Sequence, residues 1–162
     1  HGVTRQNIII LRSFGKFFGL AGVRLGFVFA ANKVLSLIND EVPLWAVNGP
    51  ALYLANKALS DDKWQAKHLK KLAESERITR YLFSDLGDEF CFHERLFSSY
   101  IFSKELALAI FRCLYNKGVL TRFIAVDDKK AILRIGRVNT EDVKAIEKLK
   151  IILEELMLTI RV

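Results

Sequence analysis

Two short, strongly apolar runs dominate the first 30 residues of the chain. Residues 7–11 read Asn-Ile-Ile-Ile-Leu, and residues 25–30 read Leu-Gly-Phe-Val-Phe-Ala. Their length and their content of β-branched and aromatic residues are typical of buried strands. We therefore predict two core strands that are joined by one short connection.

The middle of the chain has the spacing of helices. Three helices are predicted, over residues 32–39, residues 51–59 and from about residue 61 to about residue 86. A loop rich in proline and glycine separates the first two, at residues 40–50. Ser60 or Asp61 is expected to cap the third helix, and Gly87 to close it. The predicted apolar face of this long helix comprises Leu69, Leu72, Ala73, Leu82, Phe83 and Leu86.

Beyond residue 90 the pattern changes to shorter units that alternate between strand and helix. Strands are predicted over residues 96–102, 118–124 and 130–135, and helices over residues 104–116 and about 140–157. Thr140 is expected to cap the last helix. Its apolar positions are Val143, Ile146, Leu149, Ile152, Leu153 and Leu156. This order predicts an α/β protein of two pieces that the long helix connects.

Composition narrows the class of protein. With 51% hydrophobic and 11% aromatic residues, the chain is expected to be globular. No apolar run approaches the length of a membrane span, and the first residues show no signal-peptide pattern, so no membrane association is expected. Cys91 and Cys113 lie in apolar surroundings, which favours reduced thiols in a cytoplasmic compartment, with a disulfide between them as the alternative.

The connection between the first two predicted strands has the composition of a binding site. It places Ser13, Lys16 and Arg24 next to two core strands, together with Gly15, Gly19, Gly22 and Gly26. Cationic side chains are rare beside a core unless a group of opposite charge pairs with them. Glycines allow the backbone to approach a bound group closely.

Several known motifs do not account for this connection. Ser13-x-x-Lys16 matches the serine-lysine motif of penicillin-binding enzymes, but the accompanying Ser-Asp-Asn and Lys-Thr-Gly triplets are missing from the sequence. Phe17 follows Gly15-Lys16 where a phosphate-binding P-loop needs Ser or Thr. The glycine spacing does not fit a dinucleotide fingerprint. The remaining alternative is a tight turn with a solvated lysine.

The segment resembles the lysine region of fold-type I enzymes that depend on pyridoxal 5'-phosphate, the superfamily of the class I and II aminotransferases. The pattern of that superfamily is Ser-Phe-x-Lys-x-x-Gly-Leu-Ala-Gly-x-Arg-x-Gly, and residues 13–26 meet every fixed position. The resemblance implies that Lys16 forms the Schiff base with the cofactor and carries the proton at the substrate Cα. It also implies that Ser13 and Arg24 hold the cofactor phosphate. A primary amine and a guanidinium fork suit these two tasks.

The resemblance also implies how the chain is organised. Residues 1–59 would complete the large cofactor-binding domain, residues 60–87 would form a bridging helix, and residues 88–162 a small C-terminal α/β domain. The family's cofactor-stacking aromatic residue and its pyridine-binding aspartate lie well upstream of the lysine, but only 15 residues precede Lys16 here, and none is Asp or Glu. We therefore expect the C-terminal half of an enzyme whose full-length form is a homodimer. The surfaces of the two strands would then be exposed.

A second chemical signal lies near the C-terminus. Arg122 follows a Gly-Val-Leu-Thr segment, and Arg134 stands in Leu-Arg-Ile. The resemblance to the family implies that Arg134 binds the substrate carboxylate. It also implies that Arg122 helps to bind the anionic end of the substrate, as in histidinol-phosphate aminotransferases. Two arginines suit an amino acid substrate that also carries a phosphate. Arg137 stands where a small residue is common, and we interpret it as a solvated charge at a strand edge.

Within the superfamily, residues 12–18, 42–52, 59–64 and 120–123 look most like the threonine-phosphate decarboxylases of cobalamin biosynthesis. Asn48 in this region either approaches the active site or structures its loop. Decarboxylation and amino transfer both remain open, because the substrate contacts that choose between them are incomplete in this chain.

A basic binding protein without catalytic activity is the competing class. The formal net charge is +7, and basic side chains crowd the predicted long helix, which is the kind of surface that attracts nucleic acid. We favour the solvated face of an amphipathic helix and expect no nucleic-acid partner. These basic positions are Lys63, Lys67, His68, Lys70, Lys71, Arg77 and Arg80. The histidines and cysteines do not have the spacing of metal ligands, so no metal is expected.

Overall fold

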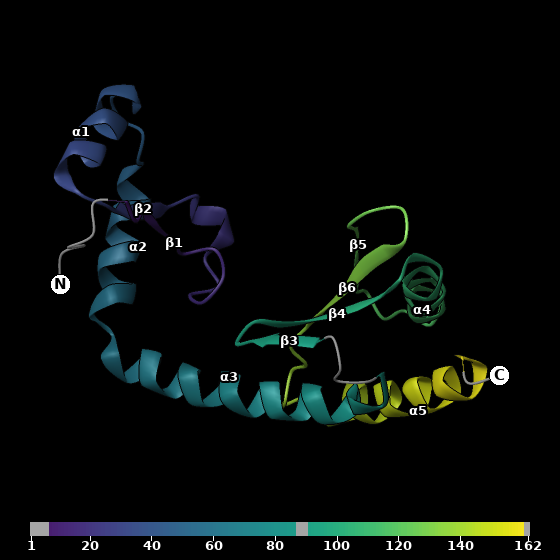
Figure 1. Cartoon of the computed structure of the whole chain (residues 1–162). Coiled ribbons are helices and arrows are strands. Elements are labelled where there is room, and N and C mark those ends of the chain that lie inside the picture. Colours follow the sequence, from purple (N-terminus) through teal and green to yellow (C-terminus); the bar gives the residue numbers. More distant parts are fainter. Residues whose placement is uncertain (1–6, 87–90, 161–162) are drawn as a thin grey trace. The chain divides into compact units, whose positions relative to one another are not determined.

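The computed structural model describes residues 7–86 and 91–160, which fold as two compact units, His1–Gln65 and Ala66–Val162. Figure 1 gives the order of the elements. The mixture of helices and small sheets in both units agrees with the predicted α/β class. In the described residues, no helix is both long and apolar enough to cross a membrane.

The first unit is built on a two-stranded antiparallel ribbon. Strand β1 (Ile10–Ser13) pairs with β2 (Gly26–Phe29), so that Ile10 lies opposite Phe29 and Ser13 opposite Gly26. A single turn of 3-10 helix, η1 (Ala21–Val23), lies in the connection between the strands. Helices α1 (Asn32–Glu41) and α2 (Gly49–Ser60) follow, close to the predicted ranges.

The two apolar strands are not buried within this chain. Leu11 is 73% exposed and Ile9 54% exposed, and every residue of β1 is exposed. The prediction of buried core strands is therefore wrong for the chain by itself. The expectation that these strand surfaces would lie open is met in the described part of the first unit, because a ribbon of two short strands cannot bury both of its faces by itself.

The junction between α2 and α3 is held by side chains that cap helix ends. Helix α3 (Asp62–Leu82) begins in the first unit and continues in the second. The Asp61 carboxylate accepts a hydrogen bond from the Trp64 amide at 2.9 Å. Of the two predicted caps, Ser60 and Asp61, it is therefore Asp61 that caps α3. Gln65 donates to the Ala58 and Leu59 carbonyls at 3.1 Å each and satisfies backbone acceptors that the end of α2 leaves free.

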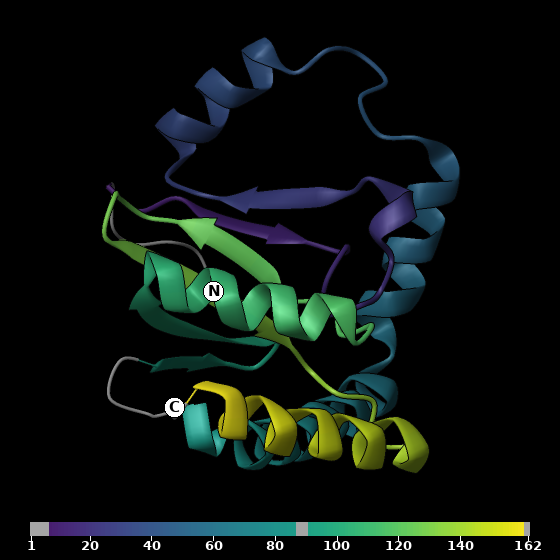
Figure 2. The same cartoon turned by 90° about the vertical axis from the view of Figure 1, so that its right-hand side faces the viewer.

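The second unit contains a four-stranded antiparallel sheet with the order β3-β4-β6-β5. Its strands are β3 (Cys91–Glu94), β4 (Phe97–Ser103), β5 (Arg122–Ala125) and β6 (Lys130–Gly136). Helix α4 (Lys104–Asn116) packs on this sheet, and α5 (Val143–Ile160) runs beside the C-terminal part of α3 (Figure 2). A short 3-10 helix, η2 (Ser84–Leu86), follows α3.

One face of this sheet carries the core. Alternate side chains of β4 and β6 point toward the helices, which buries Tyr100, Leu133 and Ile135. Their partners in the same cluster come from α4, from α5 and from the turn that follows α3: Ile110 and Leu114, then Ile152, Leu153 and Leu156, and Phe83. The other face of the sheet takes no part in this cluster.

The predicted apolar face of the long helix is correct at its C-terminal end, where Phe83 is buried and Leu82 and Leu86 pack against the core. It differs within α3 itself. Its fully or nearly buried residues are Ser75 and Thr79, whereas Ala73 is exposed. The Ser75 hydroxyl donates to the Val138 carbonyl, and the Thr79 hydroxyl accepts from the Val138 amide at 3.2 Å. Hydroxyl groups are buried here because they satisfy the backbone of the chain leaving β6.

Other boundaries also differ from the predictions. Asp142, not Thr140, caps α5, because its carboxylate accepts from the Ala145 amide at 3.0 Å. β5 begins at Arg122 instead of residue 118, and the short strand β3 was not predicted. The predicted end of the long helix at Gly87 lies outside the described residues.

The ribbon predicts a strict requirement for glycine at position 26. A Cβ on Gly26 would lie 2.7 Å from the Arg12 carbonyl oxygen, inside van der Waals contact with backbone. We expect Gly26→Ala to lower the free energy of unfolding by about 1–3 kcal/mol, measured by urea denaturation. Gly22→Ala is the matched control, because nothing lies within 4 Å of the added Cβ. Equal midpoints for the two variants would show that the ribbon accommodates a methyl group against the Arg12 carbonyl.

Candidate functional site

The connection that carries Lys16 is a compact loop closed by backbone hydrogen bonds. Phe14 donates to the Leu25 carbonyl at 3.1 Å and accepts from the Leu20 amide at 2.9 Å. The Lys16 carbonyl accepts from the Gly19 amide at 2.9 Å. Gly19 has a φ of +68°, a conformation that favours glycine. These bonds keep the ends of the loop together and fix the backbone at Lys16.

Three of the predicted site residues come together in this loop. Ser13, Lys16 and Arg24 line one cavity of about 450 Å³, and all three side chains are exposed. Gly15, Ala21, Leu25 and Gly26 complete its lining. The Ser13 hydroxyl accepts from the Gly15 amide at 3.2 Å, and the Arg24 guanidinium donates to the Ala21 carbonyl at 3.0 Å.

The chemistry of this lining favours an anion. It offers an amine, a guanidinium and a hydroxyl, and none of the residues that line it is acidic. Arginine can donate two parallel hydrogen bonds to a phosphate or a carboxylate. The cavity can therefore hold an anionic group beside the primary amine of Lys16.

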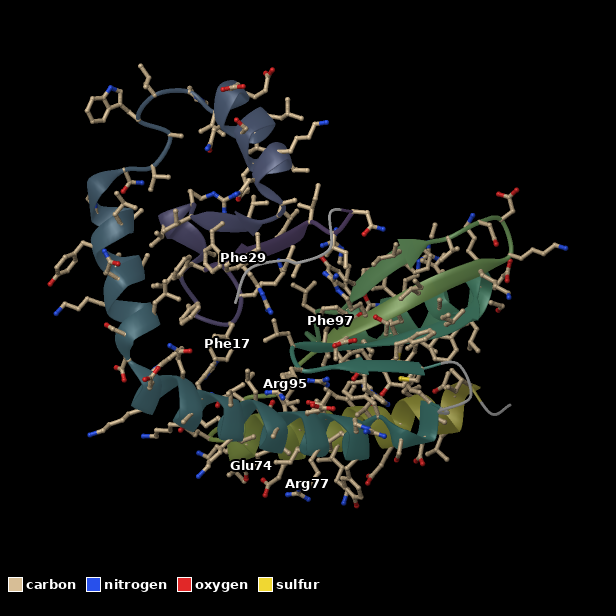
Figure 3. All side chains as sticks on the ribbon, turned by 60° about the vertical axis from the view of Figure 1, so that its left-hand side comes forward. Phe17, Phe29, Glu74, Arg77, Arg95 and Phe97 are labelled. Atoms are coloured by element: carbon tan, nitrogen blue, oxygen red, sulfur yellow. The ribbon has the colours of Figure 1, made fainter. Side chains whose placement is uncertain are left out.

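Aromatic rings pack around this loop. Phe14 is 1% exposed, stacks on Phe18 at 5.0 Å and meets Phe27 edge to face at 5.8 Å. Phe17 and Phe18 both contact Trp64 in the first turn of α3, and Figure 3 shows Phe17 on the loop. No signal in the sequence identifies Trp64 as a neighbour of this loop, since no periodicity links residue 64 to residues 17 and 18.

The other two predicted site residues lie in the second unit and are direct neighbours. Arg122 of β5 stands opposite Arg134 of β6 in the antiparallel register, and Ser99 of β4 stands opposite Arg134 on its other side. Because Leu133 and Ile135 point into the core, Arg134 lies on the opposite face of the sheet. Its guanidinium lies 4.9 Å from the ring centre of Phe97, which Figure 3 labels on β4.

Two arginines opposite one another repel, so this pairing costs stability unless an anion lies between them. The substrate-anion role of these two residues stays a prediction, and their opposition in the register is compatible with it. The structure thus forms two sets: Ser13, Lys16 and Arg24 in the first unit, and Arg122 with Arg134 in the second.

Arg137 corrects a prediction. It is half-buried rather than solvated, and its guanidinium donates to the carbonyls of Glu94, Arg95 and Phe97. It also donates to the Ser98 hydroxyl at 2.9 Å. Burial lowers the pKa of Arg137, and the nearby Glu76 opposes that shift. Arg137 thus holds the β3–β4 hairpin.

Asn48 structures its loop, one of the two roles that the sequence left open. Its side-chain oxygen accepts from the Ala51 amide at 2.8 Å, so Asn48 caps the start of α2. The loop before it exposes Leu44 and Trp45, the latter 96% exposed.

The basic residues of α3 lie mostly on its exposed side. Lys71 forms an ion pair with Glu141. Figure 3 shows Arg77 and the acidic Glu74 both pointing away from the helix into solvent. Acidic groups therefore interrupt this basic face. Within residues 7–86 and 91–160, no cluster of three or more His, Cys, Asp or Glu side chains could hold a metal ion.

Comparison with known families gives one match over most of the chain. The family described as Aminotransferase class I and II matches residues 2–148. This match covers the Lys16 loop, α3 and both arginines of the second unit.

Two curated relatives illustrate the similarity. A threonine-phosphate decarboxylase from Pseudomonas aeruginosa is 34% identical over 133 residues, which are 82% of this chain and 39% of that protein. A histidinol-phosphate aminotransferase from Carboxydothermus hydrogenoformans is 30% identical over 153 residues, which are 93% of this chain and 41% of that protein. The chain therefore spans about two fifths of the length of these relatives.

A solved structure gives the same fold. Histidinol-phosphate aminotransferase from Sinorhizobium meliloti, in complex with pyridoxal-5'-phosphate, superposes with a TM-score of 0.77 at 20% identity. The match covers 98% of this chain and 43% of that one. This similarity supports the fold-type I architecture.

The contacts of Arg137 predict a structural role that can be measured. Lysine cannot reproduce the guanidinium's hydrogen bonds to three carbonyls and a hydroxyl, so Arg137→Lys should destabilise the chain by about 1.5–3 kcal/mol. Arg112→Lys, at an exposed position of α4, is the control and should change stability by less than about 0.5 kcal/mol. Urea denaturation of both variants measures the difference. An Arg137→Lys midpoint equal to that of the control would show that these bonds contribute nothing.

Proposed function

Because this chain belongs to the class I and II aminotransferase family, we propose that it carries the lysine and phosphate-binding part of a pyridoxal-phosphate enzyme. Lys16 supplies the amine that bonds to the cofactor and then moves a proton at the substrate Cα. Ser13 and Arg24 hold the cofactor phosphate. The single observation that carries this proposal is the convergence of these three side chains on one cavity.

The residues present fit the cofactor. A dianionic phosphate pairs with a guanidinium and a hydroxyl, and the absence of acidic groups among the lining residues leaves that charge unopposed. When bound, pyridoxal phosphate supplies an aldehyde that condenses with amines and a ring that draws electrons from the substrate Cα. Lys16 is exposed at the cavity, so its amine would be accessible to a bound cofactor and could accept or donate a proton there.

Arg122 and Arg134 are proposed to bind the anionic groups of the substrate. Arg134 takes the carboxylate, and Arg122 helps to bind a second anion such as a phosphate. Their direct opposition across β5 and β6 supports this role, since an anion between them would replace repulsion with two charge-assisted contacts.

The activity proposed for the whole enzyme is that of a threonine-phosphate decarboxylase of cobalamin biosynthesis. A threonine-phosphate decarboxylase from a Sinorhizobium species is 50% identical over 62 residues of this chain, which supports this choice. The second candidate is an aminotransferase of the histidinol-phosphate type, favoured by the 93% coverage of this chain by such a relative. Both substrates, by their names, carry a phosphate.

The proposal includes the organisation of the enzyme. Residues 1–59 belong to the large cofactor-binding domain, and residues 88–162 form the small C-terminal domain. Residues 60–87 form the helix that connects the two domains. The full-length enzyme is proposed to be a homodimer in the cytoplasm. Cys91 and Cys113 are not joined in a disulfide, which is consistent with a reducing compartment.

The role of Lys16 predicts selective chemistry on the chain itself. Pyridoxal phosphate followed by borohydride should label Lys16 in preference to the other lysines, and peptide mass spectrometry locates the label. Arg24→Gln should weaken labelling at Lys16 by about 10- to 100-fold, since it removes a charge-assisted contact, and should leave labelling elsewhere unchanged. Pyridoxal, which lacks the phosphate, is the control on the unaltered chain and should show no such preference. Label found mainly at another lysine would refute the assignment.

The proposed role of Arg122 and Arg134 predicts that replacing one of them abolishes anion binding without lowering the stability of the free chain. Arg122→Gln should leave the free chain as stable or slightly more stable, by up to about 1 kcal/mol, because it relieves a like-charge pair. The same change should abolish the shifts that O-phosphothreonine causes in the amide NMR signals of β5 and β6. Arg24→Gln is the control, since it lies in the other unit and should preserve those shifts. Shifts that survive Arg122→Gln and Arg134→Gln would exclude this site.

A further inference from the structure

We propose that Trp64 is a positioning residue for Lys16, and this inference rests on the function proposed above for that lysine. Trp64 is not one of the residues that line the cavity. It acts through the two phenylalanines that directly follow Lys16 in the sequence. Its indole holds them, and they hold the backbone from which the lysine side chain extends.

The ring geometry shows how this contact is made. Trp64 stacks on Phe18 with ring centres 5.9 Å apart and an interplanar angle of 15°. It meets Phe17 edge to face at 5.8 Å and 79°. Phe17 and Phe18 also contact each other, at 5.0 Å and 86°. Three rings thus form a closed set in which each touches the other two, which restricts the rotation of all three.

The contact with Trp64 supports the loop on the C-terminal side of Lys16. On the N-terminal side of Lys16, Phe14 is 1% exposed and is held by Phe27 and by two backbone hydrogen bonds. On the C-terminal side, Phe18 stacks on Phe14 at 5.0 Å and the Gly19 amide donates to the Lys16 carbonyl, but Phe17 and Phe18 are only half-buried, and Gly19 has a φ of +68°. Lys16 itself is exposed. Its direction therefore depends on how firmly the two phenylalanines are held.

Trp64 is suited to this task because its backbone is held by helix caps. Its amide donates to the Asp61 carboxylate at 2.9 Å, at the start of α3. The next residue, Gln65, donates to the last carbonyls of α2. Trp64 is 38% exposed. Its indole projects from a corner whose backbone is hydrogen-bonded on both sides, and it packs on the Phe17 and Phe18 rings of the loop.

The test separates positioning from simple stability. On the chain 1–162, two quantities are measured: the affinity for inorganic phosphate, reported by the amide NMR signals of Gly15 and Arg24, and the rate at which saturating pyridoxal phosphate labels Lys16. Trp64→Ala should slow labelling about tenfold, since each ring contact is worth about a 2- to 10-fold effect, and should change phosphate affinity less than twofold. General unfolding of the loop would weaken both.

Matched variants keep the inference falsifiable. Trp64→Phe retains a stacking ring and should restore the labelling rate to within about twofold of the unaltered chain. Trp64→Leu retains apolar bulk without a ring and should remain slow, which covers the case in which Trp64→Ala does not fold. Trp45→Ala removes the other tryptophan, which is 96% exposed, and should have no effect.

The outcomes distinguish the two proposals. If Lys16 is labelled selectively but Trp64→Ala and Trp64→Leu react as fast as Trp45→Ala, the positioning role is wrong while the function of Lys16 stands. If the unaltered chain shows no preference for Lys16, the proposed function fails and the inference fails with it. Slow labelling in Trp64→Leu, with phosphate affinity intact and recovery in Trp64→Phe, supports the proposal.

Discussion

An exposed lysine can have a definite position only when the residues on either side of it are held, and aromatic packing does this here. Phe14, buried to 1% exposure, anchors the loop before Lys16, and Phe17 and Phe18 pack against Trp64 after it. The backbone bonds between Phe14, Leu20 and Leu25 then close the loop. The cavity beside Lys16 depends on this arrangement, because Ser13 and Arg24, at the two ends of the loop, line it together with the lysine only when those ends meet.

The same chain places positive charge in two different ways. Arg122 and Arg134 stand opposite each other with no acidic side chain in their row of the sheet, which costs stability and suits an anionic ligand. Arg137 comes directly after β6, only three residues beyond Arg134. Its guanidinium donates hydrogen bonds to backbone carbonyls and to the Ser98 hydroxyl. Arginines that are close in sequence therefore have different surroundings: Arg137 holds the fold, whereas Arg134 stands opposite another arginine and is the one proposed to bind a ligand.

Much of the local structure could be predicted because it depends on neighbours in the sequence. The helix α4 has the predicted bounds, and β4 and β6 differ from theirs by one residue. Predictions failed where a residue's environment is set by distant parts of the chain. Ser75 and Thr79 are buried because Val138 needs their hydroxyls, and no pattern within α3 contains that information. The apolar strands β1 and β2 have the composition of a core, yet composition does not say whether a covering layer is present.

The sequence by itself determined the family and supplied the candidate residues Ser13, Lys16 and Arg24, because residues 13–26 meet every fixed position of the family's pattern. It also determined most helix and strand positions, since periodicity and capping are local. Only the tertiary structure decided which of these residues share a space. It joined Ser13, Lys16 and Arg24 in one cavity, set Arg122 against Arg134, turned Arg137 inward and brought Trp64 to the lysine loop. The physical reason is that register, ring packing and desolvation act between residues far apart in the chain, so their outcome is absent from any single segment.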